Sequence, residues 1–80
     1  MSRLSPEQCR AARGLLGWTQ EELAERAKVS RSTIRDFENE RHSLNPGTAA
    51  QVVAAFEDGG ALLIPSGDAG PGVRLRKPVG

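Results

Sequence analysis

The chain has few of the residues that build disulfide frameworks, metal sites and redox centres. Its 80 residues include one Cys, one His and no Tyr. One Cys cannot form a disulfide within the chain, and one Cys with one His cannot supply the ligand set of a structural zinc site. We therefore expect a fold held by its hydrophobic core, without metal or cofactor, in a reducing compartment.

Long apolar runs and a strong net charge are missing as well. No apolar stretch approaches the roughly 18 residues that span a bilayer, and the N-terminal segment MSRLSPEQCR lacks the apolar core of a signal peptide. These features predict a cytoplasmic protein without a membrane contact. The net charge is only +1, so overall electrostatics do not indicate a nucleic-acid partner. Positive charge is local instead, because arginines gather in residues 31–41 and 74–76.

Helix start signals divide the first 58 residues into four segments. Residues 5–8 read Ser-Pro-Glu-Gln and residues 19–22 read Thr-Gln-Glu-Glu, and both are capping-box patterns. Ser30 supplies a third N-cap, and Asn45 followed by Pro46 supplies a fourth. Apolar residues recur at helical spacing after these starts: Cys9, Ala12, Leu15 and Leu16; Leu23, Ala24 and Ala27; Ile34 and Phe37; Ala49, Val52, Val53 and Phe56. We predict a mainly helical, four-helix domain over residues 1–58.

Three residues with functional chemistry have a structural alternative. Trp18 precedes the second capping box, where it can pack on Leu23 as a hydrophobic staple, so we assign it to structure. Cys9 lies on an apolar helix face without a second thiol, which favours a core residue over a redox sensor. His42 falls between the third and fourth helices without a catalytic partner, and solvent exposure is favoured over a backbone or phosphate contact.

Residues 59–80 change in character. The run ALLIP is typical of a short strand, SGDAGPG is turn-forming, and VRLR alternates apolar and charged residues. This pattern predicts a C-terminal β-hairpin, or strands exchanged between two copies, that could serve in dimerisation. The candidate dimer or DNA contacts are Leu63, Val73, Arg74, Leu75 and Arg76, although arginines on short strands also discourage edge pairing.

The second and third helices have the spacing of a helix-turn-helix. Counting from Gln20, a small residue stands at the fifth position (Ala24), and apolar residues stand at the tenth, fifteenth and eighteenth (Val29, Ile34 and Phe37). With the caps in the same order, residues 6–58 resemble the lambda-repressor and Cro (XRE-type) family of helix-turn-helix regulators. The family usually has Gly at the turn position occupied here by Lys28, so we expect local strain there.

The resemblance implies a DNA-binding role for the third helix and its surroundings. The residues that match base-reading positions are Arg31, Ser32, Arg35 and Asp36, where Arg suits guanine and Asp can accept from cytosine. The residues that match contacts to the sugar-phosphate backbone are Thr19, Gln20, Thr33, Asn39, Arg41 and Asn45. Arg13 and Glu38 match a structural bridge between the first and third helices.

These features together predict a sequence-specific regulator that binds double-stranded DNA. We expect a repressor that acts as a homodimer on a palindromic operator, with half-sites about 34 Å apart. Two alternatives remain: a DNA-binding antitoxin whose C-terminal segment binds a small protein partner, or a protein-interaction module that sequesters another regulator. An enzyme is not expected, because no nucleophile with a base and no phosphate-binding glycine loop is present.

Overall fold

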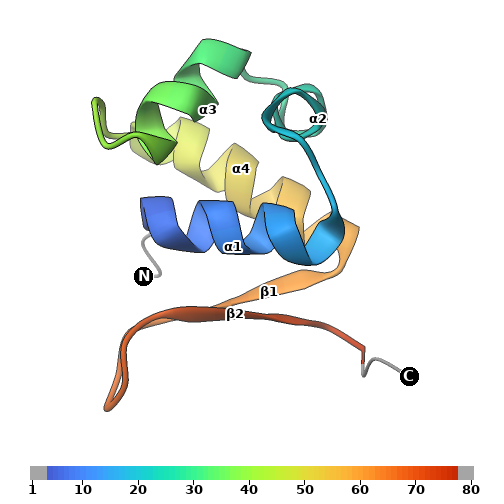
Figure 1. The fold of residues 1–80 in the computed structure, drawn as a ribbon, viewed down its shortest axis with the longest axis vertical. Helices are drawn as coiled ribbons and strands as arrows, with labels where there is room; N and C mark the ends of the chain where they lie inside the picture. The colour runs from blue at the N-terminus through green and yellow to red at the C-terminus, as the bar shows by residue number, and fades with distance from the viewer. Residues whose placement is uncertain (1–3, 78–80) are drawn as a thin grey trace.

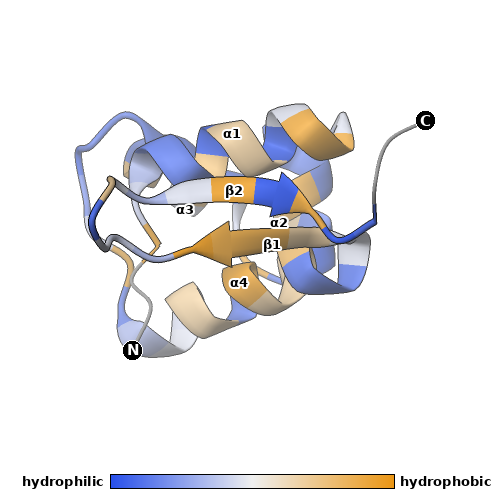
Figure 2. Cartoon of the chain, turned by 90° about the horizontal axis from the view of Figure 1, so that it is seen from below, coloured by the Kyte–Doolittle hydropathy of each residue, from blue (hydrophilic) through white to orange (hydrophobic). Residues whose placement is uncertain are grey.

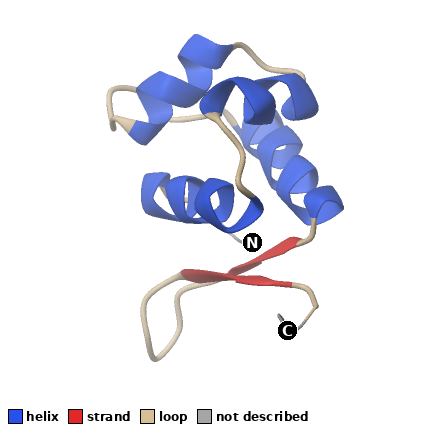
Figure 3. Ribbon diagram, turned by 45° about the vertical axis from the view of Figure 1, so that its right-hand side comes forward, coloured by secondary structure: helices blue, strands red, loops and turns tan. Residues whose placement is uncertain are grey.

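The computed structural model describes residues 4–77, which form four helices followed by a two-stranded antiparallel sheet (Figure 1). The elements are α1 (Pro6–Leu16), α2 (Gln20–Ala27), α3 (Arg31–Glu38), α4 (Pro46–Gly59), β1 (Ala61–Ile64) and β2 (Gly72–Leu75). The mainly helical class with a C-terminal hairpin is therefore confirmed. The helices form the body of the molecule, and both strands lie together on one side of it (Figure 3). None of the described helices is long and apolar enough to cross a membrane.

Each helix begins at the cap that the sequence predicts. The four N-cap side chains accept a hydrogen bond from the backbone N–H three residues later: Ser5 from Gln8, Thr19 from Glu22, Ser30 from Thr33 and Asn45 from Thr48. Each of these bonds satisfies one of the backbone donors that a helix start leaves free. Local chemistry thus sets the helix starts, and with them the orientation of the apolar faces.

Two turns place a residue other than glycine in the left-handed region. Lys28 ends α2 with a φ of 59°, and Glu40 follows α3 with a φ of 61°. A side chain in this region costs on the order of 1 kcal/mol relative to glycine. The strain expected at Lys28 is therefore present, and Glu40 adds a second strained position in the loop between α3 and α4.

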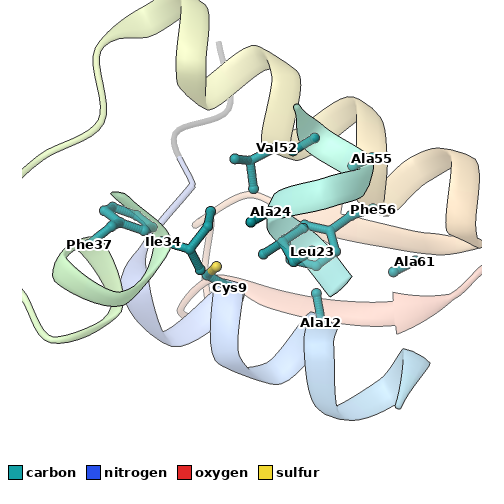
Figure 4. Close-up of a cluster of buried hydrophobic side chains, with 11 residues drawn as sticks. Cys9, Ala12, Leu23, Ala24, Ile34, Phe37, Val52, Ala55, Phe56 and Ala61 are labelled. Atoms are coloured by element: carbon teal, nitrogen blue, oxygen red, sulfur yellow. The ribbon is translucent and has the colours of Figure 1, made fainter. Parts of the chain in front are cut away.

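Side chains from all four helices and from the first strand meet in one hydrophobic core (Figure 4). Its members are Cys9, Ala12, Leu23, Ala24, Ala27, Ile34, Phe37, Val52, Ala55, Phe56 and Ala61. Five of the larger side chains are fully buried, namely Phe56, Leu23, Ile34, Val52 and Cys9. This core fixes α3 by its inner face only and leaves the opposite face of the helix free.

Trp18 packs at the edge of this core. Its ring stacks on Phe56 with centroids 5.9 Å apart and an interplanar angle of 16°. The guanidinium of Arg26 lies 4.4 Å from the Trp18 ring centroid, in cation–π geometry. The indole also approaches Gly59 so closely that a Cβ built there would lie 2.5 Å from its Cζ2 atom. Trp18 is thus a structural residue, and Gly59 provides the space for it.

The C-terminal hairpin is part of the fold, because it packs across α1 and α4 (Figure 2). Its strands pair with Leu63 opposite Val73, and both side chains pack against the core. Arg74 and Ile64 are exposed, the latter by 36%. Of the residues that we considered for dimer or DNA contacts, Leu63 and Val73 therefore already have partners within their own chain.

Two side chains fasten the hairpin to the helices. The Gln8 amide donates from Nε2 to the backbone oxygens of Ile64 and Gly72, each at 3.1 Å. Arg76 donates from Nη2 to the backbone oxygen of Glu57, at 2.5 Å, near the C-terminus of α4. Arg76 thus binds a carbonyl in the last turn of α4, where a positive charge is favourable. Leu75 lies opposite Ala61 and is half-buried.

Candidate nucleic-acid interface

The turn between α2 and α3 joins two short helices in close contact. Ala24 is 4% exposed at this contact, where a small side chain lets the helices approach. The backbone N–H of Val29 donates to the Ala24 oxygen at 3.0 Å and closes the turn through Lys28. Ile34 is fully buried, so α3 is fixed against the body of the molecule by its inner face.

The outer face of α3 is polar and accessible. Arg31, Ser32 and Arg35 are exposed, whereas Ile34 and Phe37 fill the inner face. The side chains of Arg35 and Asp36 are 49% and 24% exposed, and they form an ion pair in which Nε lies 3.3 Å from Oδ1. The four predicted base-reading residues thus lie in one short helix whose outer face carries two arginines.

Hydroxyl groups gather at the N-terminus of α3. Ser30 Oγ lies 2.6 Å from Thr33 Oγ1 and 3.2 Å from Ser32 Oγ. The same oxygen accepts the backbone N–H of Thr33 at 3.2 Å. Ser32 and Thr33 therefore begin the helix with polar groups held in place, at the end that carries the positive pole of the helix dipole.

Glu38 joins three helices behind this surface. It is 2% exposed, and its carboxylate accepts from Arg13 at 2.7 and 2.8 Å, from Gln20 at 3.0 Å and from Cys9 at 3.1 Å. Burial opposes ionisation of Glu38, but the hydrogen bonds from Arg13, Gln20 and Cys9 outweigh it and hold its pKa below the usual value. The structural bridge expected between Arg13 and Glu38 is present and ties α1 to α3.

The same cluster changes the environment of two other residues. Burial raises the pKa of the Cys9 thiol, and the neighbouring Glu38 carboxylate adds to this effect. Cys9 is therefore a buried hydrogen-bond donor. The Gln20 side chain, expected on a phosphate, donates to Glu38 from the first position of α2. Thr19 likewise accepts from the Glu22 N–H and closes the capping box.

The loop after α3 presents the remaining candidates. Asn39 and Arg41 are exposed, and the backbone N–H of Arg41 donates to the Asp36 oxygen at 2.8 Å. Asn45 caps α4, so its side-chain oxygen is engaged by Thr48 N–H at 2.8 Å. The acidic Glu40 stands between Asn39 and Arg41. These groups lie at the C-terminal end of α3 and the N-terminal end of α4, beside the exposed face.

A comparison with protein-family models matches residues 10–57 to the Helix-turn-helix model, which covers more than half of the chain. The chain belongs to the lambda-repressor-like helix-turn-helix family. A search of curated proteins finds no match. Membership makes this a helix-turn-helix DNA-binding protein of a non-enzymatic family, and α2 with α3 is the motif itself. Among residues 4–77, no group of three or more His, Cys, Asp or Glu residues could hold a metal ion.

Two residues of this helix-turn-helix domain escaped the sequence interpretation. Arg10 on α1 donates to the backbone oxygen of Glu38 at the end of α3. Gln8 was predicted only as a capping residue, yet it also binds the hairpin. All three contacts join residues at least 28 positions apart, so no local pattern could indicate them.

Proposed function

We propose that this helix-turn-helix protein is a transcriptional repressor that places α3 in the major groove of specific duplex DNA. The observation that supports the proposal is the exposed polar face of α3 with Arg31 and Arg35, fixed from behind by Ile34 and Phe37. An α-helix fits the major groove, and arginine is the usual partner of guanine O6 and N7. Ser32 and Asp36 lie on the same helix and complete the set of residues that match base-reading positions.

Contacts to the DNA backbone would come from both ends of this surface. Arg41 and Asn39 are exposed beside the end of α3 and can reach phosphates without a change in the fold. Thr19, Gln20, Thr33 and Asn45 already have intramolecular hydrogen bonds. Thr19 and Asn45 are N-caps, and Gln20 and Thr33 lie in the first turn of their helices. All four would therefore approach a phosphate beside a helix start, whose free N–H groups attract anions. Such contacts position the protein and carry no sequence information directly.

A homodimer on a two-fold symmetric operator completes the proposal. One eight-residue α3 reads only a few base pairs, and two copies with half-sites about 34 Å apart double the length of the site. Occupation of such a site next to a promoter, in the cytoplasm, would block transcription. Deletion of the hairpin is a poor test of dimerisation, because Ala61 is fully buried and its loss would also expose the core.

Selection of bound duplexes from a random library tests this function, followed by titration of the selected sequence at several salt concentrations. We expect a palindromic consensus and a binding constant that falls linearly with salt on a logarithmic scale. Sedimentation of the complex gives the number of chains per site. No enrichment together with no binding at low salt would refute the proposal, and a single asymmetric half-site with one chain bound would refute the dimer alone.

A further inference from the structure

The ion pair on the exposed face of α3 joins two neighbouring residues that both match base-reading positions. Arg35 donates from Nε to Oδ1 of Asp36 at 3.3 Å. Every other polar contact of α3 side chains within residues 4–77 belongs to the Ser30 cap or to Glu38. The pair is thus a separate feature of the outer face and serves no helix-to-helix contact.

The atoms in this pair leave the base-binding end of the arginine free. In the Arg35 guanidinium, Nε joins the group to the aliphatic chain and the two Nη atoms are terminal. Only Nε donates a hydrogen bond to the Asp36 carboxylate. Guanine is recognised by two parallel donors on its O6 and N7 atoms. The terminal nitrogens of Arg35 can make this contact while Asp36 keeps Nε.

Asp36 itself is poorly suited to read a base directly. Its side chain is 24% exposed, about half the value of 49% for Arg35, and one of its oxygens is already engaged. A carboxylate near phosphates is repelled by them, and the positive charge of a paired arginine offsets this repulsion.

We propose that Asp36 is a positioning residue, which holds the guanidinium of Arg35 in the orientation that reads guanine. The proposal rests on the DNA-binding function proposed above and refines it. An arginine side chain loses considerable rotamer freedom when it binds, and a side chain held beforehand loses less. Loss of the carboxylate therefore weakens binding to the preferred site by about fivefold and leaves sites with another base at that position unchanged.

The test compares four variants with the wild type, namely Asp36→Asn, Asp36→Glu, Arg35→Ala and the double variant Arg35→Ala with Asp36→Asn. Each is profiled on a library in which every base pair of the selected operator is varied. Asp36→Asn should relax the preference at the same base pair as Arg35→Ala and have no further effect in the Arg35→Ala background. Asp36→Glu, which keeps the carboxylate, should restore part of the preference. In the free protein, the NMR signal of the Arg35 Nε–H should shift in Asp36→Asn, while thermal unfolding shows that the fold is retained.

Three results would overturn the assignment. They are a relaxed preference at a different base pair, additive losses in the double variant, and an Arg35 Nε–H signal that is the same with and without the carboxylate. Failure of the proposed function looks different, because the wild type would then enrich no sequence at all while the NMR comparison still reports on the pair.

Discussion

Replacement of Gly59 by alanine tests whether the indole of Trp18 is held rigidly against the end of α4. The new Cβ would lie 2.5 and 2.6 Å from Cζ2 and Cη2 of Trp18 and 3.2 Å from Cδ1 of Leu16. Such distances are far below van der Waals contact, so one of the groups must shift. The indole has little freedom to move, because Phe56 stacks on it at 5.9 Å and Arg26 lies against it at 4.4 Å.

Two opposing effects determine how much Gly59→Ala changes the free energy of unfolding. Alanine is favoured over glycine within a helix by about 1 kcal/mol, whereas forcing an additional carbon into a packed site costs about 1 to 3 kcal/mol. We expect the collision to dominate at Gly59, with a net loss of about 1 to 2 kcal/mol. Gly14 provides the matched control, because it lies in α1 and a Cβ added there would meet no atom within 4 Å. Gly14→Ala should therefore stabilise the protein by up to about 1 kcal/mol.

Urea unfolding followed by tryptophan fluorescence measures the stability of Gly59→Ala and of Gly14→Ala, since Trp18 is the only tryptophan. Unfolding is followed in parallel by circular dichroism, because the substitution is next to the fluorescent residue and because variants that carry Trp18→Phe contain no tryptophan. Trp18→Phe removes the two colliding carbons, so in that background Gly59→Ala should lose most of its destabilising effect. Gly59→Ala with a stability equal to the wild type, or an undiminished loss in the Trp18→Phe background, would refute the reasoning.

Further predictions concern the buried carboxylate, the strained turn and the DNA contacts. Glu38→Gln should destabilise the fold by about 3 kcal/mol at neutral pH, because it leaves Arg13 without its partner. The pKa of Glu38 is lower in the folded than in the unfolded protein, so its contribution to stability is complete above the unfolded pKa of about 4 and is lost as the pH falls through the folded pKa. Chemical denaturation at several pH values should therefore show the stabilities of the wild type and Glu38→Gln converging in acid. Lys28→Gly should raise stability by up to about 1 kcal/mol, and a measured loss in urea unfolding would show that the turn is not strained. Arg35→Ala should cost about 1 to 3 kcal/mol of binding and relax one base pair, whereas Arg41→Ala should weaken all duplexes evenly; equal, sequence-independent losses would contradict these roles.

Much of the fold could be predicted because its determinants are local. N-caps at Ser5, Thr19, Ser30 and Asn45 act within one turn of helix, and all four helices begin directly after them. The spacing from Ala24 to Phe37 likewise depends only on helix geometry and a short turn. For such features the sequence pattern contains the relevant chemistry.

The candidate site was only partly predictable, because each polar side chain in it can form hydrogen bonds with several groups of the protein or with DNA. Gln20 matches a phosphate-binding position, but the buried Glu38 accepts from it at 3.0 Å. Leu63 and Val73 were candidates for contacts with DNA or a second chain, yet the hairpin packs on α1 and α4 and leaves both side chains partly buried against the core. These outcomes depend on tertiary packing, which brings together residues that no sequence period relates. The DNA contacts themselves stay predictions.

Gln8 both caps α1 and holds the hairpin, and this has a consequence for local unfolding. Its side-chain oxygen accepts the Ser5 N–H at the start of α1, while its amide nitrogen holds the carbonyls of Ile64 and Gly72. An isolated two-stranded hairpin is at best marginally stable in water, so detachment of the Gln8 side chain removes support from the start of α1 and from the hairpin together. In native-state hydrogen exchange, the hydrogen-bonded amides of Ser5, Gln8 and Cys9 and those of the hairpin should therefore open as a single cooperative unit with a common free energy, separate from α2 and α3.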